Sequence, residues 1–154
     1  MQDSTEVTRR RMLTMMAAAP LVLISMRALS AAPAVSVFKL TGCGCCDLWA
    51  EHLRMNGFAV SVRVVPDLTP VRARYGIPDA FGTCHTALVD GYAIEGHVPA
   101  ADIHRLLRSK LKVAGLAVPG MPAGSPGMEG QRSEPYDVLA FDRNGAAKVY
   151  AHYQ

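Results

Sequence analysis

The sequence predicts an α/β fold with a mixed β-sheet and flanking helices, and three observations support this prediction. The chain has 154 residues, a length that suits one ordinary domain and leaves little room for two. Hydrophobic residues make up 50% of it, far too many for a disordered chain. From residue 35 onward, short apolar runs typical of strands alternate with segments that have helical periodicity.

The first three elements are predicted to be a strand, a helix and a second strand. Residues 35–40 form an apolar run typical of a buried strand. Residues 47–55 carry acidic side chains early and a basic one late, as a helix prefers. Residues 58–64 alternate between apolar and polar, which indicates a strand parallel to the first. The apolar residues expected on the buried side of the helix are Leu48, Trp49 and Leu53.

The middle of the chain is predicted to form a short helix, a β-hairpin and a longer helix. The short helix covers residues 69–75 and ends at a glycine. Residues 85–89 and 92–97 form the hairpin, because an Asp-Gly turn pair separates them. A proline at position 99 opens the longer helix, whose apolar side comprises Ile103, Leu106, Leu107 and Leu111. This order of elements is that of a thioredoxin-like domain.

The C-terminal part of the chain is predicted to add a loop and a second hairpin. Residues 113–135 contain five glycines and four prolines, which indicates a long Gly/Pro-rich loop. A long loop in a compact domain is usually functional or mobile. Residues 136–141 and 146–153 form a C-terminal β-hairpin around an Asn-Gly turn pair.

The N-terminus, residues 1–32, has the organisation of an export signal that is removed. Arg9, Arg10 and Arg11 precede an uncharged stretch of 15 residues, and small residues suited to a signal peptidase follow. A membrane helix needs about 20 apolar residues, so no stable membrane span is expected in the mature chain. The paired arginines are typical of the twin-arginine pathway. We therefore expect a single periplasmic domain of residues 33–154. No basic run lies outside the signal, which argues against nucleic-acid binding.

All four cysteines fall in two places that this fold brings together. Cys43, Cys45 and Cys46 crowd the turn after the first strand, and Cys84 directly precedes the strand at residues 85–89. In a thioredoxin-like domain these two loops lie side by side, so the four thiols are expected to converge. Packed thiolates repel unless a cation neutralises them, and soft thiolates select Cu(I), Zn²⁺ or an iron–sulfur cluster. Closely spaced cysteines suit several bridged Cu(I) ions better than one tetrahedral Zn²⁺.

Two other interpretations of the cysteines stay open. Cys43 and Cys46 form a Cys-x-x-Cys motif, which predicts a redox-active dithiol in this fold. Exported proteins also keep structural disulfides. Additional candidate ligands are His85, which follows Cys84, and Met121 and Met128, which bracket the proline-rich part of the loop. A methionine thioether is a soft Cu(I) ligand, although it serves equally as a hydrophobic anchor.

Four motifs in one order resemble the CopG-type copper-resistance family, long catalogued as a domain of unknown function. They span residues 42–49, 84–87, 92–99 and 115–129, and they read GCGCCDLW, CHTA, YAIEGHVP and GLAVPGMPAGSPGME. The resemblance covers almost all of the predicted mature chain. It implies a periplasmic, thioredoxin-like, copper-binding protein associated with copper tolerance, with the four cysteines as the metal site.

The leading hypothesis is therefore a periplasmic protein that binds copper as Cu(I). The thiolates of Cys43, Cys45, Cys46 and Cys84 would hold the metal. The protein partner would be a copper efflux or delivery protein. The first alternative is an enzyme, a thiol–disulfide or copper oxidoreductase that uses Cys43 and Cys46. The second alternative is an iron–sulfur electron-transfer protein, since twin-arginine export suits a cofactor inserted before export.

Overall fold

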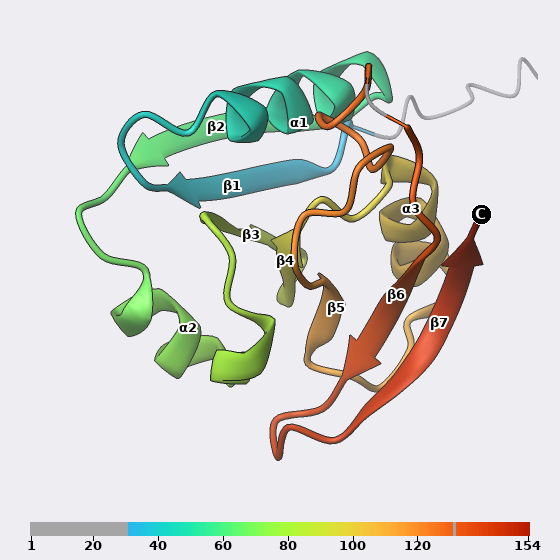
Figure 1. Ribbon diagram of the computed structural model, residues 1–154. Coiled ribbons are helices and arrows are strands. Elements are labelled where there is room, and N and C mark those ends of the chain that lie inside the picture. Colours follow the sequence, from blue (N-terminus) through green and yellow to red (C-terminus); the bar gives the residue numbers. More distant parts are fainter. Residues whose placement is uncertain (1–30, 131) are drawn as a thin grey trace, which may run out of the picture. The chain divides into compact units, whose positions relative to one another are not determined.

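The computed structural model describes residues 31–130 and 132–154, which form a seven-stranded sheet with helices packed against it (Figure 1). The predicted export signal lies outside the described residues, except for its last two positions. Within the described part of the chain, no helix is both long and apolar enough to cross a membrane. The helices are α1 (Gly44–Met55), α2 (Thr69–Tyr75) and α3 (Ala100–Ser109), with a 3-10 turn η1 (Asp79–Phe81). The strands are β1 (Ala34–Lys39), β2 (Ala59–Val64), β3 (His85–Val89), β4 (Tyr92–Gly96), β5 (Gly115–Val118), β6 (Tyr136–Phe141) and β7 (Ala147–Tyr153).

The sheet is mixed, as the sequence predicts. Its strand order is β2-β1-β3-β4-β5-β6-β7. β1 pairs with β2 in parallel through the crossover helix α1, and β4 pairs with β5 in parallel through α3. The remaining neighbours are antiparallel, including the predicted hairpins β3–β4 and β6–β7. The end of β1 and the start of β3 therefore lie side by side, and this arrangement brings the two cysteine segments together.

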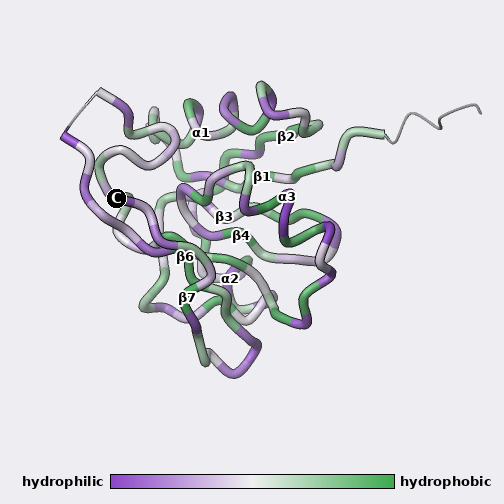
Figure 2. The backbone as a smooth tube through the Cα atoms, turned by 90° about the vertical axis from the view of Figure 1, so that its right-hand side faces the viewer, coloured by the Kyte–Doolittle hydropathy of each residue, from purple (hydrophilic) through white to green (hydrophobic). Residues whose placement is uncertain are grey.

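The two faces of the sheet are covered by different helices. α1 and α3 share one hydrophobic core with buried residues of β1, β3, β4, β5 and β6, and Trp49, Leu53, Ile103 and Leu106 are fully buried in it. A smaller cluster around Ile77 and Phe141 lies on the opposite face, beside α2 and η1. Hydrophobic and hydrophilic residues alternate along α1 in Figure 2, as expected of an amphipathic helix with one buried side.

Three details of the predicted helices are wrong. α1 begins at Gly44 rather than at residue 47, and its buried positions are Cys46, Trp49, Ala50 and Leu53. That spacing sets Leu48 one position off the buried stripe, and its side chain is 59% exposed. α3 ends at Ser109, with Lys110 in the left-handed conformation, so Leu111 lies beyond the helix and is 40% exposed.

The segment predicted to be a Gly/Pro-rich loop begins with a strand, β5. β5 is only four residues long, and all four are buried between β4 and β6. A run this short beside glycines and prolines has no local strand signal, because pairing with two neighbours is what defines it. The loop proper starts at Pro119, where β5 ends beside the end of β4.

Candidate metal centre

The turn between β1 and α1 gathers three cysteines at the start of a helix. Gly42 adopts a left-handed conformation (φ 76°), which glycine permits without strain, and Cys43 then occupies the N-cap position of α1 without a side-chain capping hydrogen bond. Lys39 holds this turn: its Nζ donates to the Cys43 carbonyl (3.2 Å) and pairs with the Asp47 carboxylate (2.5 Å). Cys45 and Cys46 follow in the first helical turn, where unpaired backbone N–H groups favour anions such as thiolates.

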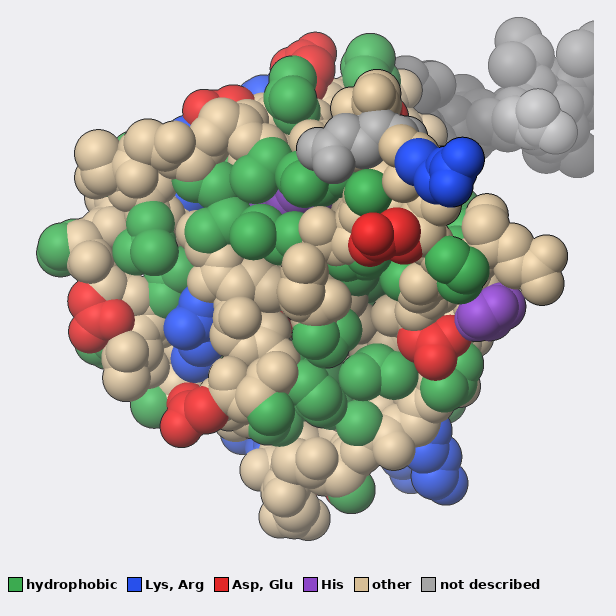
Figure 3. Space-filling view, in the orientation of Figure 1, with side chains coloured by type: hydrophobic (Ala, Val, Ile, Leu, Met, Phe, Trp, Pro, Cys, Tyr) green, Lys and Arg blue, Asp and Glu red, His purple; other side chains and the backbone are tan. Residues whose placement is uncertain are grey.

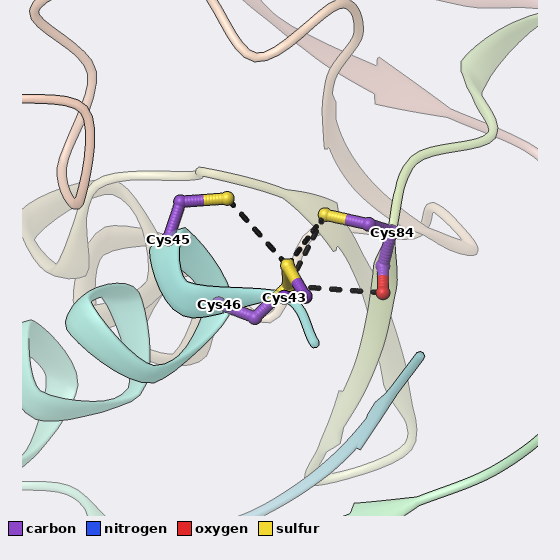
Figure 4. A group of neighbouring side chains, drawn as sticks. All are labelled: Cys43, Cys45, Cys46 and Cys84. Carbon is purple, nitrogen blue, oxygen red and sulfur yellow. Dashed lines mark hydrogen bonds between the residues drawn. A yellow bond between two sulfur atoms is a disulfide. The ribbon is translucent and has the colours of Figure 1, made fainter. Parts of the chain in front are cut away.

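Cys84 faces this turn from the segment just before β3. Its carbonyl accepts a hydrogen bond from the Leu40 N–H (3.1 Å), which joins the two segments. Its Sγ lies 2.9 Å from that of Cys43 and 3.1 Å from that of Cys46. Figure 4 shows the Cys84 side chain turned toward these two cysteines. Cys45 Sγ is 3.5 Å from Cys43 Sγ, and all four sulfur atoms lie within 4.8 Å of one another. The predicted convergence of four cysteines is confirmed.

The four sulfur atoms are not equivalent. Cys43 and Cys46 form a disulfide, whereas Cys45 and Cys84 are free thiols and half-buried. Burial, and then the neighbouring Cys45, raise the pKa of Cys84 to about 11. Without a metal, Cys84 is therefore a protonated thiol at neutral pH. A metal ion bound here would displace that proton, because metal ligation requires the thiolate.

Met121 adds a fifth sulfur atom to the cluster. Its Sδ lies 3.3 Å from Cys84 Sγ, while its backbone is left-handed (φ 48°), a conformation that costs energy for a residue with a side chain. The loop is thus held with the thioether turned toward the cysteines. The hydrogen bonds of Met128, by contrast, are made by its backbone to Gly124 and Ser125. Among the predicted methionine contacts, Met121 is the one with a sulfur beside the cluster.

The loop after β5 packs closely over the start of α1. Gly127 is left-handed (φ 89°), and a Cβ on it would lie 2.8 Å from the Cys45 carbonyl oxygen and 2.9 Å from the backbone nitrogen of Trp49. Figure 3 shows hydrophobic side chains gathered on this face of the molecule. Trp49 lies beneath, fully buried, and its indole N–H donates to the Val98 carbonyl (2.9 Å). This packing shields one side of the cluster from water.

Two buried histidines lie behind the cysteines. The His85 ring lies between that of Trp49, to which it is tilted (centroids 4.5 Å apart), and that of His97, on which it stacks (5.3 Å). Burial lowers the pKa of His85 to about 3 and that of His97 to about 4, so both rings are neutral at pH 7. His85 Nε2 pairs with the Gly96 carbonyl (3.0 Å), so Nε2 carries the proton. The described residues offer no hydrogen-bond partner to His85 Nδ1.

Two further histidines, His52 and His104, make contacts between segments that are far apart in sequence. His52 is half-buried, and its Nε2 accepts a hydrogen bond from the Ala100 N–H at the start of α3 (3.2 Å). The His104 ring stacks on Phe58. Both rings fill helix contacts that periodicity alone does not reveal, because they depend on how α1 and α3 pack.

The site is also supported by three charged residues that the sequence motifs do not mark: Lys39, Arg72 and Glu95. Lys39 is 7% exposed, and Glu95 is fully buried behind Cys84, where Arg72 pairs with it. The sequence signal for them is a charged residue within an apolar strand, as Lys39 is in β1 and Glu95 is in β4. A fully buried carboxylate needs partners, so a lone acidic residue there marks a polar network.

The arrangement defines a class of protein: a mixed α/β domain with a cluster of soft sulfur ligands suited to a metal ion. The family described as "Protein of unknown function, DUF411" matches residues 81–128. Two solved structures, of copper resistance protein CopG in Form 1 and Form 2, are 49% and 48% identical to the chain, each with a TM-score of 0.74. The alignments cover 78% and 79% of this chain and 96% and 98% of those chains. Curated protein sequences gave no match.

The chain therefore belongs to the CopG-type copper-resistance family. At this identity and coverage the relationship extends over the described domain, beyond the segment that the family model matches. Together with the four-cysteine cluster, it supports copper-related metal binding.

Proposed function

We propose that the protein is a periplasmic Cu(I)-binding protein of copper tolerance, with Cys43, Cys45, Cys46 and Cys84 as ligands. The observation that carries this proposal is the meeting of four cysteine sulfur atoms within 4.8 Å. Soft thiolates prefer Cu(I). The family relationship favours copper over the other soft metals. Met121 and His85 are additional ligands, and Met128 ranks below Met121 because its sulfur has no contact with a cysteine sulfur among the described contacts.

The site suits more than one copper ion. Cys43, Cys45 and Cys46 are close neighbours in sequence, so their sulfur atoms bridge adjacent ions more readily than they surround one ion tetrahedrally. About four Cu(I) ions would balance the charge of four thiolates. Full occupancy also requires reduction of the Cys43–Cys46 disulfide, which takes two electrons and two protons from a dithiol reductant.

The biological setting is part of the same proposal. Residues 1–32 direct export by the twin-arginine pathway and are removed, and residues 33–154 form a single thioredoxin-like metal-binding domain. The β1-α1-β2 unit followed by the β3-β4-α3 unit supports the thioredoxin-like assignment. In the periplasm the protein would pass copper to an efflux or delivery protein.

The decisive experiment is metal content together with thiol content. The mature protein is purified without oxidant from copper-supplemented cells, and copper, zinc, iron and free thiols per chain are measured. Two or more copper ions per chain, lost in Cys84→Ser, would support the proposal. Unchanged copper in that variant would remove Cys84 from the site. Iron with a brown colour would instead favour the iron–sulfur alternative, since Cu(I) thiolates are colourless.

The Cys43–Cys46 disulfide favours a second candidate function, a copper or thiol oxidoreductase. Two Cu(I) ions would each lose one electron to the disulfide, and two protons would convert its sulfur atoms to thiols, leaving two Cu(II) ions. Cys84 Sγ lies within 3.1 Å of both disulfide sulfur atoms, so the proposed metal site and the disulfide share the same sulfur atoms. Stoichiometric formation of thiols and Cu(II) after Cu(I) is added anaerobically to the oxidised protein would support this function. Cu(I) bound without new thiols would contradict it.

A further inference from the structure

A buried polar network holds the residue that precedes Cys84. Glu95 on β4 is fully buried, and its carboxylate accepts hydrogen bonds from four donors. Oε1 accepts from the Thr83 N–H (2.7 Å), the Thr83 hydroxyl (3.0 Å) and Arg72 Nε (3.2 Å). Oε2 accepts from the Thr86 hydroxyl (2.5 Å). All the donors but Arg72 belong to the segment that carries Cys84.

Arg72 reaches the same residue from α2. While its Nε pairs with Glu95, its Nη2 donates to the carbonyl of Thr83. The N–H, hydroxyl and carbonyl of Thr83 are therefore all held by one ion pair. Charged Arg–carboxylate hydrogen bonds are directional, so they restrict both the position and the rotation of this backbone.

Residues 82–84 need such support because they belong to no helix or strand. Cys84 is anchored on its other side by Leu40, whose N–H donates to the Cys84 carbonyl. Between these two anchors, Cys84 Sγ has little freedom to leave Cys43 and Cys46. A buried carboxylate is expensive, and apolar side chains would fill the same space at lower cost. This cost points to a role in placing the backbone rather than in stability.

We propose that Glu95 and Arg72 are positioning residues for Cys84, which fix the Thr83 backbone so that Cys84 Sγ meets the cysteines of α1. The effect of these residues on copper binding rests on the proposed function. Their effect on the Cys84 thiol does not, since Cys84 Sγ already lies beside the cysteines of α1 in the metal-free protein.

The test compares Glu95→Leu with the isosteric Glu95→Gln in the full chain. Iodoacetamide labelling with peptide mass spectrometry gives the alkylation rates of the two free thiols, with Cys45 as an internal reference for Cys84. Glu95→Leu is expected to change the Cys84:Cys45 rate ratio severalfold. Glu95→Gln, which keeps the acceptor for Thr83, is expected to stay near wild type. Glu51→Leu removes an exposed carboxylate on α1 and serves as the matched control.

Copper binding provides the second readout. Competition for Cu(I) against a chromophoric chelator should show roughly 10- to 100-fold weaker binding in Glu95→Leu, the scale seen when a group that supports a metal ligand is removed. Arg72→Met frees the Thr83 carbonyl but leaves three donors on Glu95, so it tests the inference even if Glu95→Leu does not fold. It should shift the rate ratio in the same direction.

Three outcomes would overturn the inference. The first is an unchanged Cys84:Cys45 ratio of alkylation rates in both Glu95→Leu and Arg72→Met, and the second is an equal rise of the two alkylation rates. The third is a rate ratio in Glu95→Gln that changes as much as in Glu95→Leu. A wild-type protein that binds no copper would refute the proposed function, whereas the alkylation ratio would still decide whether Glu95 and Arg72 position Cys84.

Discussion

The Sδ atom of Met121 lies 3.3 Å from the Sγ atom of Cys84, and this contact joins the loop after β5 to the cysteine cluster. The loop thereby places a thioether, the candidate soft ligand proposed above, beside the cysteine sulfur atoms. Met121 has a left-handed backbone next to Gly120, which is left-handed too. Strain of this kind persists where the surrounding structure imposes it, and it is common at functional sites.

Replacing Met121 by leucine is expected to weaken Cu(I) binding about tenfold, on the scale of a lost supporting group in a metal site. Leucine has a similar volume, so stability should change little. Chelator competition measures the affinity, and Met128→Leu is the matched comparison, with a smaller expected loss. Equal losses of Cu(I) affinity in the two variants would contradict a specific role for the Met121 sulfur.

The thiol count should depend on the redox state of one pair. The protein isolated in air is expected to show two titratable thiols after denaturation, Cys45 and Cys84, because Cys43 and Cys46 are joined. Reduction by a dithiol should raise the count to four and should increase the copper bound per chain. Thiol titration with copper analysis checks both. Equal copper uptake before and after reduction would show that the disulfide cysteines are not ligands.

Gly127→Ala should destabilise the protein more than Gly130→Ala. Both glycines have a φ near 90°, so both substitutions carry similar backbone strain. A Cβ at residue 127 would also collide with backbone atoms of α1, whereas at residue 130 it would meet nothing within 4 Å. The collision should cost a further ~1–3 kcal/mol, the usual range for overpacking. Urea unfolding gives the difference, and equal effects would mean that the loop does not pack on α1 in solution.

Acid should destabilise the metal-free protein between about pH 6.5 and pH 4. Burial lowers the pKa of His97 to about 4 and that of His85 to about 3, while histidines in the unfolded chain titrate near 6.5. In this range the unfolded state binds more protons, so the free energy of unfolding falls as the pH falls. Urea unfolding across this pH range should show that the free energy of unfolding falls less steeply with pH in His97→Gln than in the wild type. A decline as steep as in wild type would contradict a buried, neutral His97.

Much of the fold could be predicted because its elements carry local signals. The β1-α1-β2 unit, the hairpin at residues 85–97 and the C-terminal hairpin follow from periodicity and turn residues, and the structure confirms them. β5 could not be predicted, because its four residues become a strand only between β4 and β6. Leu48 was misplaced because a short helix allows more than one apolar stripe, and tertiary packing chooses between them.

The sequence by itself determined the chemistry available to this protein: four cysteines in two segments, soft methionines in one loop, and a family pattern of copper resistance. Spacing and residue type are local properties, and they set which ligands exist. Only the tertiary structure decided which of them meet. It brought Cys84 and Met121 to the start of α1, and it placed Glu95 and Arg72 behind them. Contacts between residues far apart in sequence depend on strand order and loop packing, which no single segment encodes.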